Sequence, residues 1–249
     1  MSKLKNKVAI VTGASKGIGT GIAKAYGTEG ASVVVNYSSD KEGADRVVNE
    51  ITASGGKAIA VQGNVALAAD VKNLFSETKN AFGQVDILVN NAGVFKFEPL
   101  EVITEEEFHR QFNINVLGTI LTTQQAVNDF GDHGGSIINI SSVVSDNPVS
   151  YSVVYSATKG AVDTIAIALS KELAGKKIRV NTIAPGGVET EGTHTAGIIG
   201  SDFETQMVAG TPLGRIGQPD DIAKVAVFLA SDDAQWINGE KINVSGGLR

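Results

Sequence analysis

The chain has 249 residues, of which 42% are hydrophobic and 19% charged, and this composition is typical of a folded globular protein without low-complexity tracts. Its formal net charge of −6 and its scattered basic residues argue against a surface that binds nucleic acid or an anionic membrane. The absence of cysteine excludes disulfides and thiolate chemistry, and no apolar run suits a signal peptide or a membrane span, so we expect a cytoplasmic protein.

Short runs rich in β-branched residues alternate along the chain with longer segments of helical periodicity, as in buried parallel sheets. The predicted strands are Val8–Val11, Ser32–Val35, Ala58–Val61, Val85–Val89, Ser136–Ile140, Ile178–Ile183 and Lys241–Val244. The predicted helices between them are Ile18–Thr28, Lys41–Ala53, Val71–Phe82, Phe108–Phe130 and Val154–Leu173. The alternation predicts a single α/β domain over 1–249, a Rossmann-like doubly wound parallel sheet of about seven strands with helices on both faces.

The segment 186–214 interrupts this alternation, because it fits neither a strand nor a long helix. It is rich in glycine, at Gly186, Gly187, Gly192, Gly197, Gly200, Gly210 and Gly214. Long irregular segments in compact domains are usually functional or mobile. This one follows the carboxyl end of a predicted strand, where α/β sheets bind ligands. We therefore expect a mobile substrate loop here, with a tolerated surface insertion as the alternative.

A glycine-rich turn follows the first predicted strand and opens the first predicted helix. It reads Thr12-Gly13-Ala14-Ser15-Lys16-Gly17-Ile18-Gly19. Glycines permit a tight bend, and the free N–H groups and dipole of the helix favour a phosphate. The spacing differs from the G-x-G-x-x-G fingerprint, and an isolated turn of this kind is equally well explained as structural. Its place at strand one of an alternating chain favours a dinucleotide site.

The end of the second predicted strand bears on the choice between NAD and NADP. An acidic residue there would bind the ribose 2′-hydroxyl and select NAD. The stretch Asn36-Tyr37-Ser38-Ser39 offers no acid, and Lys16 could face a 2′-phosphate. The pattern therefore favours NADP(H) over NAD(H). Asp40 points the other way, since a loop displaced by one residue would bring its carboxylate close.

Tyr155 and Lys159 lie one helical turn apart, so both project from the same face. A phenol with its ordinary pKa near 10 exchanges protons poorly at neutral pH, and a neighbouring ammonium stabilises its phenolate. Such a pair is common on helix surfaces, so it indicates catalysis only together with other motifs. His109, His133 and His194 form no recognisable triad or metal site, and we expect neither hydrolysis nor metal catalysis.

Taken in order, these motifs resemble those of the short-chain dehydrogenase/reductase family. The turn matches T-G-x-x-x-G-x-G, and further matches are Asn90-Asn91-Ala92-Gly93, Asn115, Ser142, Tyr155-Ser-Ala-Thr-Lys159 and Pro185-Gly186. The resemblance covers essentially the whole chain. It is greatest to 3-oxoacyl-carrier-protein reductases and to glucose dehydrogenase-like carbonyl reductases.

The resemblance implies a catalytic tetrad. Tyr155 gives a proton to the carbonyl oxygen as the nicotinamide C4 hydride reaches the carbonyl carbon, and Ser142 orients the same oxygen. Lys159 also holds the nicotinamide ribose, and Asn115 anchors a water through which Lys159 exchanges protons. In the family the serine lies thirteen residues before the tyrosine, which selects Ser142 over Ser141.

The remaining expected site residues bind the cofactor or the substrate. The resemblance assigns cofactor binding to Gly13, Ser15, Lys16, Gly17, Ile18, Gly19, Tyr37, Ser38, Ser39, Asn64, Val65, Asn91, Ala92, Gly93, Tyr155, Lys159, Pro185, Gly186, Val188 and Thr190. An apolar substrate pocket is expected from Phe95, Phe97, Val144, Val149, Tyr151 and Met207. These side chains favour an apolar or aromatic ketone.

The leading hypothesis is an NADPH-dependent carbonyl reductase, an oxidoreductase of CH–OH and C=O groups. The resemblance implies a homotetramer formed through the helices that carry Asn115 and Tyr155. The alternatives are a 3-oxoacyl-carrier-protein reductase, a sugar or polyol dehydrogenase, and an NADP-binding sensor. Acidic residues in the stretch 128–135 argue against binding of an acidic carrier protein, whereas basic residues at 171–179 are compatible with such binding.

Overall fold

The computed structural model describes residues 2–248 and is built around one seven-stranded sheet. Its strands are β1 (Val8–Val11), β2 (Ser32–Tyr37), β3 (Lys57–Gln62), β4 (Ile87–Asn90), β5 (Gly135–Ile140), β6 (Ile178–Pro185) and β7 (Lys241–Val244). They lie in the order β3-β2-β1-β4-β5-β6-β7, and every pairing is parallel. The seven predicted strands and the doubly wound parallel fold are therefore confirmed.

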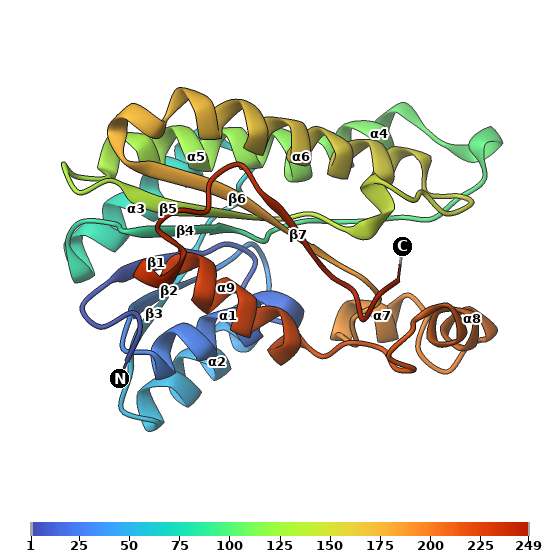
Figure 1. Cartoon of the computed structure of the whole chain (residues 1–249), viewed down its shortest axis with the longest axis horizontal. Helices are drawn as coiled ribbons and strands as arrows, with labels where there is room; N and C mark the ends of the chain where they lie inside the picture. The colour runs from blue at the N-terminus through green and yellow to red at the C-terminus, as the bar shows by residue number, and fades with distance from the viewer. Residues whose placement is uncertain (1, 249) are drawn as a thin grey trace.

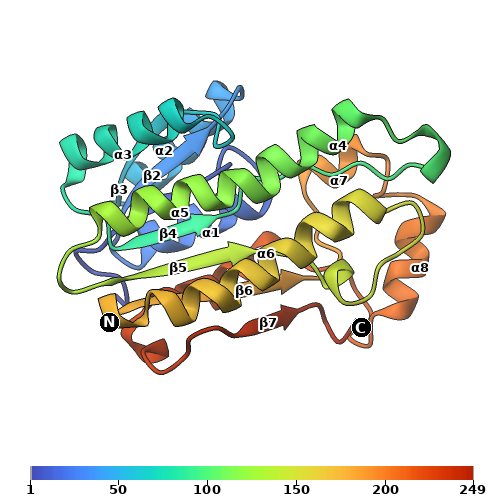
Figure 2. The ribbon, with the colours of Figure 1, turned by 90° about the horizontal axis from the view of Figure 1, so that it is seen from above.

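Helices cover both faces of the sheet and bury two separate apolar layers. One face carries α1 (Gly17–Thr28), α2 (Lys41–Ala53) and α9 (Pro219–Ala230), whose apolar side chains join one core cluster. The other carries α3 (Ala68–Phe82), α5 (Gly118–Asp129) and α6 (Val153–Glu172), which pack in a second cluster. Figure 1 shows these layers on either side of the sheet, and Figure 2 looks onto the layer that contains α5 and α6. Helix α9 was not among the predicted helices.

The helix predicted over Phe108–Phe130 is divided into three parts. It consists of α4 (Glu105–Phe112), a π-helical turn (Asn113–Leu117) and α5. Such turns often occur at functional sites. Here the turn carries Asn115, which is buried and bonded to the chain at Val94. The widened turn therefore connects this helix to the segment after β4.

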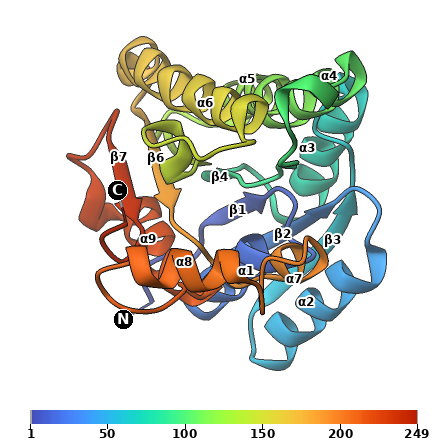
Figure 3. The same cartoon turned by 90° about the vertical axis from the view of Figure 1, so that its right-hand side faces the viewer.

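The segment 186–214, expected to be irregular, contains two short helices, α7 (Glu191–Thr195) and α8 (Asp202–Gly210). Thr190 caps α7, because its hydroxyl accepts from the Thr193 N–H at 3.2 Å. Ser201 caps α8 in the same way through the Glu204 N–H at 3.3 Å. Figure 3 looks onto this end of the molecule and shows α7 and α8 on the side of α1. The mobility of the segment stays a prediction.

Candidate functional site

A cavity of about 750 Å³ lies at the carboxyl ends of the strands. Most of the residues that the sequence singled out line it together. They are Gly13, Ser15, Lys16, Gly17, Ile18, Ser38, Ser39, Asn64, Val65, Asn91, Ala92, Gly93, Phe95, Phe97, Ser142, Val144, Val149, Tyr155, Lys159, Pro185, Gly186, Val188, Thr190 and Met207. The fold thus gathers these scattered motifs, since parallel strands end at one edge of the sheet.

Tyr37 and Tyr151 do not line this cavity. Consecutive strand residues face opposite sides, so Asn36 lines the cavity and Tyr37 is buried in the core between sheet and helices. Tyr151 is 62% exposed, and its backbone has a positive φ of 67°. The expected pocket residue Tyr151 therefore lies outside the cavity wall, with its side chain largely in solvent.

Gly19 and Asn115 also lie outside the lining but support it. A Cβ at Gly19 would stand 2.5 Å from the Asn91 amide nitrogen, so glycine is needed here for packing under the turn. The Asn115 Oδ1 accepts from the Val94 N–H at 2.8 Å, and its Nδ2 donates to the Val94 carbonyl at 2.8 Å and to the Thr158 hydroxyl at 3.0 Å.

The glycine-rich turn is fixed from two sides by hydrogen bonds. The Thr12 hydroxyl accepts from the N–H groups of Asn91 and Ala92, both at 3.0 Å. The Asn91 side chain donates to the carbonyls of Thr12 and Gly13 at 2.8 and 3.0 Å. The Asn36 side chain accepts from the Gly13 N–H at 3.2 Å. These bonds shape the turn while leaving its open side to the cavity.

The region that would distinguish the two nicotinamide cofactors contains Lys16, Ser38, Ser39 and Asp40, all of which line the cavity. Lys16 is exposed there. The Asp40 carboxylate caps α2 by accepting from the Gly43 N–H at 2.9 Å. This bond holds the Asp40 carboxylate at the start of α2, so the carboxylate borders the same part of the cavity as the lysine and the serine hydroxyls.

Tyr155 and Lys159 lie in the cavity wall on α6, with the Lys159 Nζ 5.6 Å from the centre of the tyrosine ring. The Lys159 ammonium donates to the Ile140 carbonyl at 2.9 Å. Burial lowers the pKa of Lys159 to about 8, and the Asp163 carboxylate opposes this effect. Burial raises the pKa of Tyr155 to about 12, and a hydrogen bond with Ser142 opposes it. Both groups are therefore predominantly protonated at neutral pH.

Aromatic rings surround the phenol on its substrate side. The centres of Phe95 and Phe97 lie 5.8 and 6.0 Å from that of Tyr155. Phe203 of α8 stands 6.5 Å from Phe97. The sequence does not predict Ile114, Ile216 and Leu248 in the lining. It predicts a substrate loop over 186–214 without singling out Ile198, Ile199 and Phe203 within it. The pair Phe203 and Met207, spaced four apart behind Ser201, was the available signal for a capped helix.

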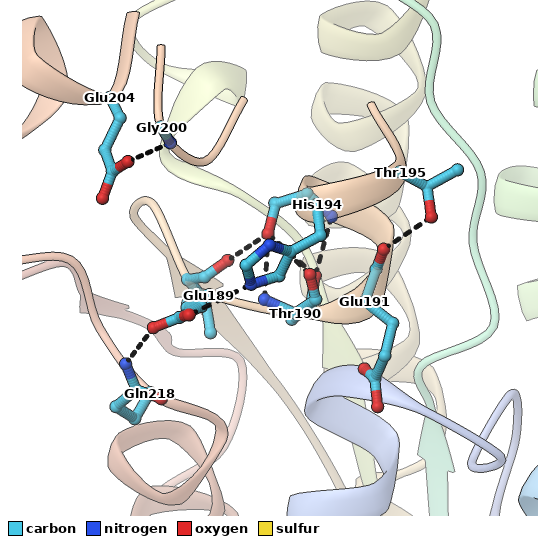
Figure 4. Close-up of polar contacts among 10 residues, drawn as sticks. Glu189, Thr190, Glu191, His194, Thr195, Gly200, Glu204 and Gln218 are labelled. Carbon is cyan, nitrogen blue, oxygen red and sulfur yellow. Dashed lines mark hydrogen bonds and ion pairs between the residues drawn. The ribbon is translucent and has the colours of Figure 1, made fainter. Parts of the chain in front are cut away.

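Polar contacts of α7 join the segment after β6 to the rest of the site. The Glu191 carboxylate accepts from the Gly17 N–H of the glycine turn at 2.9 Å. The Glu189 carboxylate bonds the His194 ring at 3.0 Å and the Gln218 amide at 2.9 Å, as Figure 4 shows. Hydrogen bonds therefore connect the start of α7 both to α1 and to the residue before α9.

Neither a membrane span nor a metal centre is found within residues 2–248. None of the helices there is both long and apolar enough to cross a membrane. That part of the chain also holds no group of three or more side chains suited to bind a metal ion. His194 and His109 instead pair with neighbouring glutamates at the surface.

Comparisons with known proteins agree in covering nearly the whole chain. The sequence profile described as enoyl-(acyl carrier protein) reductase matches residues 13–249. An uncharacterised oxidoreductase from Methylorubrum extorquens is 60% identical over 249 residues, which are 100% of both chains. Versicolorin reductase 1 from Aspergillus parasiticus is 39% identical over 254 residues, covering 98% of this chain and 97% of that protein. The crystal structure of the angucycline C-6 ketoreductase LanV with bound NADP matches with a TM-score of 0.93 at 36% identity, over 99% of this chain and 97% of LanV.

Proposed function

We propose, given that this chain belongs to the short-chain dehydrogenase/reductase family and is an oxidoreductase of carbonyl and hydroxyl groups, that it reduces a ketone with NADPH. The observation that carries the proposal is the pair formed by the half-buried Tyr155 and the buried Lys159 in the wall of a mainly apolar cavity. Two of the relatives are named as reductase and ketoreductase, and we extend keto reduction from them to this chain.

The residues present fit a dinucleotide at the glycine turn. A Cβ at Gly13 would lie 2.8 Å from the Ala92 Cα, so only glycine fits at this position of the turn. Helix α1 begins at Gly17, which lines the cavity, and the Gly17 N–H already binds the Glu191 carboxylate at 2.9 Å, as it would bind a diphosphate oxygen. Lys16 with Ser38 and Ser39 would hold a 2′-phosphate, which is why we propose NADP(H) over NAD(H).

The other end of the cavity suits a nicotinamide riboside. The Lys159 ammonium would bind the ribose hydroxyls, and the segment from Pro185 to Thr190 would hold the nicotinamide carboxamide. Asn64 and Val65 would flank the adenine at the opposite end. When bound, a reduced nicotinamide supplies the hydride for the reaction.

Tyr155 is the proposed proton donor. Its high pKa keeps the phenol protonated at neutral pH, and the Lys159 ammonium stabilises the phenolate left after the proton moves to the carbonyl oxygen. Ser142 would donate a hydrogen bond to that oxygen while negative charge develops on it. The carbonyl carbon gains the hydride and its oxygen gains the tyrosine proton, so the product is a neutral alcohol. Asn115 would position the water that returns a proton through Lys159.

The proposed substrate is a flat, largely aromatic ketone. Phe95, Phe97 and Phe203 place aromatic faces and edges around the phenol, and Val144, Val149 and Met207 add apolar surface. Aromatic pairs contribute about 0.5–1.5 kcal/mol each beyond the burial of their area. A polyol would find few partners on this wall.

Stopped-flow loss of NADPH absorbance against a set of ketones tests the proposal. The set should contain a bicyclic aromatic ketone, an aliphatic keto ester and an acetoacetyl thioester. A sugar is tested separately in the reverse direction, by the gain of NADPH absorbance from NADP⁺. We expect the fastest turnover with the aromatic ketone and a loss of at least a hundredfold in Tyr155→Phe. Tight NADPH binding without turnover of any compound would instead favour a sensor.

We also propose that the chain forms a homotetramer through the outer face of α4, α5 and α6. Large apolar side chains exposed on these helices and on the π-helical turn are Phe108, Leu117, Ile120, Val153 and Ile167. Exposed apolar surface of this kind commonly marks an interface. Light scattering coupled to size exclusion should give four times the chain mass, and a monomer mass would refute it.

A further inference from the structure

Charged side chains of alternating sign lead away from Tyr155 through the protein. Lys159 stands one helical turn from Tyr155 on α6, and Asp163 stands one turn further along the same face. The Asp163 carboxylate pairs with the Lys241 ammonium of β7 at 2.7 Å, and Lys241 also pairs with Asp146 at 2.7 Å. The order of charge from Lys159 to Asp146 is therefore plus, minus, plus, minus.

The middle of this series is shielded from solvent, whereas its far end is not. The Asp163 and Lys241 side chains are 14% and 20% exposed, against 65% for Asp146. The Asp163 Oδ1 is buried and has no hydrogen-bond partner among residues 2–248. Charges act on one another more strongly where water is excluded. Asp163 therefore acts on Lys159 with little screening.

Lys241 also contacts the turn that carries Ser142. Its ammonium donates to the Ser145 hydroxyl at 2.6 Å, and that hydroxyl donates to the Ser142 carbonyl at 2.7 Å. One ammonium thus holds the serine turn, α6 and β7 together. The catalytic serine and the catalytic helix share it as a common anchor.

We propose that the Asp163–Lys241 pair is a positioning device that sets the charge of Lys159 and holds the serine turn against α6. Its meaning for catalysis rests on the proposed function. Neither residue lines the cavity, so both act through Lys159 and Ser142. The carboxylate favours the Lys159 ammonium, and Lys241 limits that influence by neutralising most of the carboxylate's charge.

Few other charges act on Lys159. Tyr155 and Asp163 are the titratable groups near it on its own helix. The groups facing it from neighbouring elements, Asn115 on the π-helical turn and the carbonyl of Ile140 on β5, are uncharged. Lys241 and Asp146 reach it only through Asp163. This isolation makes the effect of the pair measurable.

Substitutions at the two members should move the pKa of Lys159 in opposite directions. Asp163→Asn removes the favourable carboxylate, so the pKa should fall by about one unit from its value near 8. Lys241→Met leaves the carboxylate uncompensated, so the pKa should rise by up to about one unit. A role confined to packing would lower activity in both variants without opposite shifts.

The first measurement follows the lysine ¹³Cε resonances of the full chain against pH without cofactor, with Lys159 assigned from the spectrum of Lys159→Arg. Asp146→Asn is the matched control, because it removes an exposed carboxylate from the same ammonium and should leave the Lys159 titration unchanged. Shifts of the same sign in Asp163→Asn and Lys241→Met, or none, overturn the inference. Lys241→Gln serves if Lys241→Met does not fold.

The second measurement is the pH profile of kcat/KM with NADPH and a ketone. Activity needs the Lys159 ammonium, so kcat/KM should fall at alkaline pH as Lys159 loses its proton. The midpoint of that fall should move to a lower pH by about one unit in Asp163→Asn and to a higher pH in Lys241→Met. No turnover in the unaltered chain or in any variant, together with opposite resonance shifts, would refute the proposed function and support the pair. Full turnover with unmoved resonances would refute the pair alone.

Discussion

Replacing Asn115 with alanine should loosen the connection between the π-helical turn and the chain after β4. The substitution removes the partners of the Val94 N–H and carbonyl, each bonded at 2.8 Å, and one bond to the Thr158 hydroxyl. A polar group left unpaired costs about 1–3 kcal/mol, and Val94 is half-buried, so we expect a loss of about 3 kcal/mol in the free energy of unfolding. For a chain of this size that corresponds to a fall in Tm of about 6–12 °C.

Thermal unfolding followed by circular dichroism without cofactor measures this loss independently of any activity. Asn113→Ala is the matched control, since Asn113 occupies the same π-helical turn but is exposed. Its Tm should change by no more than about 1 °C. Equal falls in both variants, or a fall below about 2 °C in Asn115→Ala, would refute the view that the amide holds Val94 in place.

Three further predictions concern the cavity. Glu191→Gln should tighten NADP binding about fivefold, as measured by calorimetry, because it removes a negative charge from the Gly17 N–H that a phosphate would use. Glu189→Gln is the control and should leave NADP binding unchanged. Weaker binding in Glu191→Gln would contradict this reasoning. Lys159→Met should raise Tm at pH 7 by about 3 °C, because the unfolded lysine keeps its proton up to its ordinary pKa of 10.5 and the folded one only up to about 8. Raising the pH through that window should remove the penalty, so a gain unchanged at pH 10.5 would count against a buried ammonium. Phe203→Ala should raise KM for an aromatic ketone about tenfold and leave KM for a small aliphatic ketone unaffected. Trp236→Ala is the control, because Trp236 is an exposed aromatic residue that does not line the cavity. Equal changes for both ketones would exclude an aromatic contact.

The sequence was most informative where chain order alone decides position. Buried strands appear as continuous apolar runs, and residues that follow them meet at one edge, so the glycine turn, Asn91 and Ser142 were brought together as expected. The side of the sheet to which each strand residue points was harder to predict, because polar and apolar residues do not alternate clearly at the end of β2. Tyr37 was therefore chosen where Asn36 lines the cavity.

Backbone features outside regular elements explain the other differences. Tyr151 has a positive φ and a largely exposed side chain, and nothing in the neighbouring sequence signals that conformation. The π-helical turn at Asn115 depends on the bonds to Val94, which come from a distant part of the chain. The position of Phe203 in the cavity wall depends on α8, a capped helix that was not predicted because the segment around it is rich in glycine.

The contact between Glu191 and the glycine turn bears on the sequence of events at the site. The same segment that reaches the Gly17 N–H through α7 carries Phe203 on α8, so one piece of chain borders both the glycine turn and the aromatic wall. A dinucleotide bound as proposed would lie against this segment and form part of the surface that meets the ketone. Steady-state kinetics should show a compulsory order, in which NADPH enters first and the oxidised cofactor leaves last.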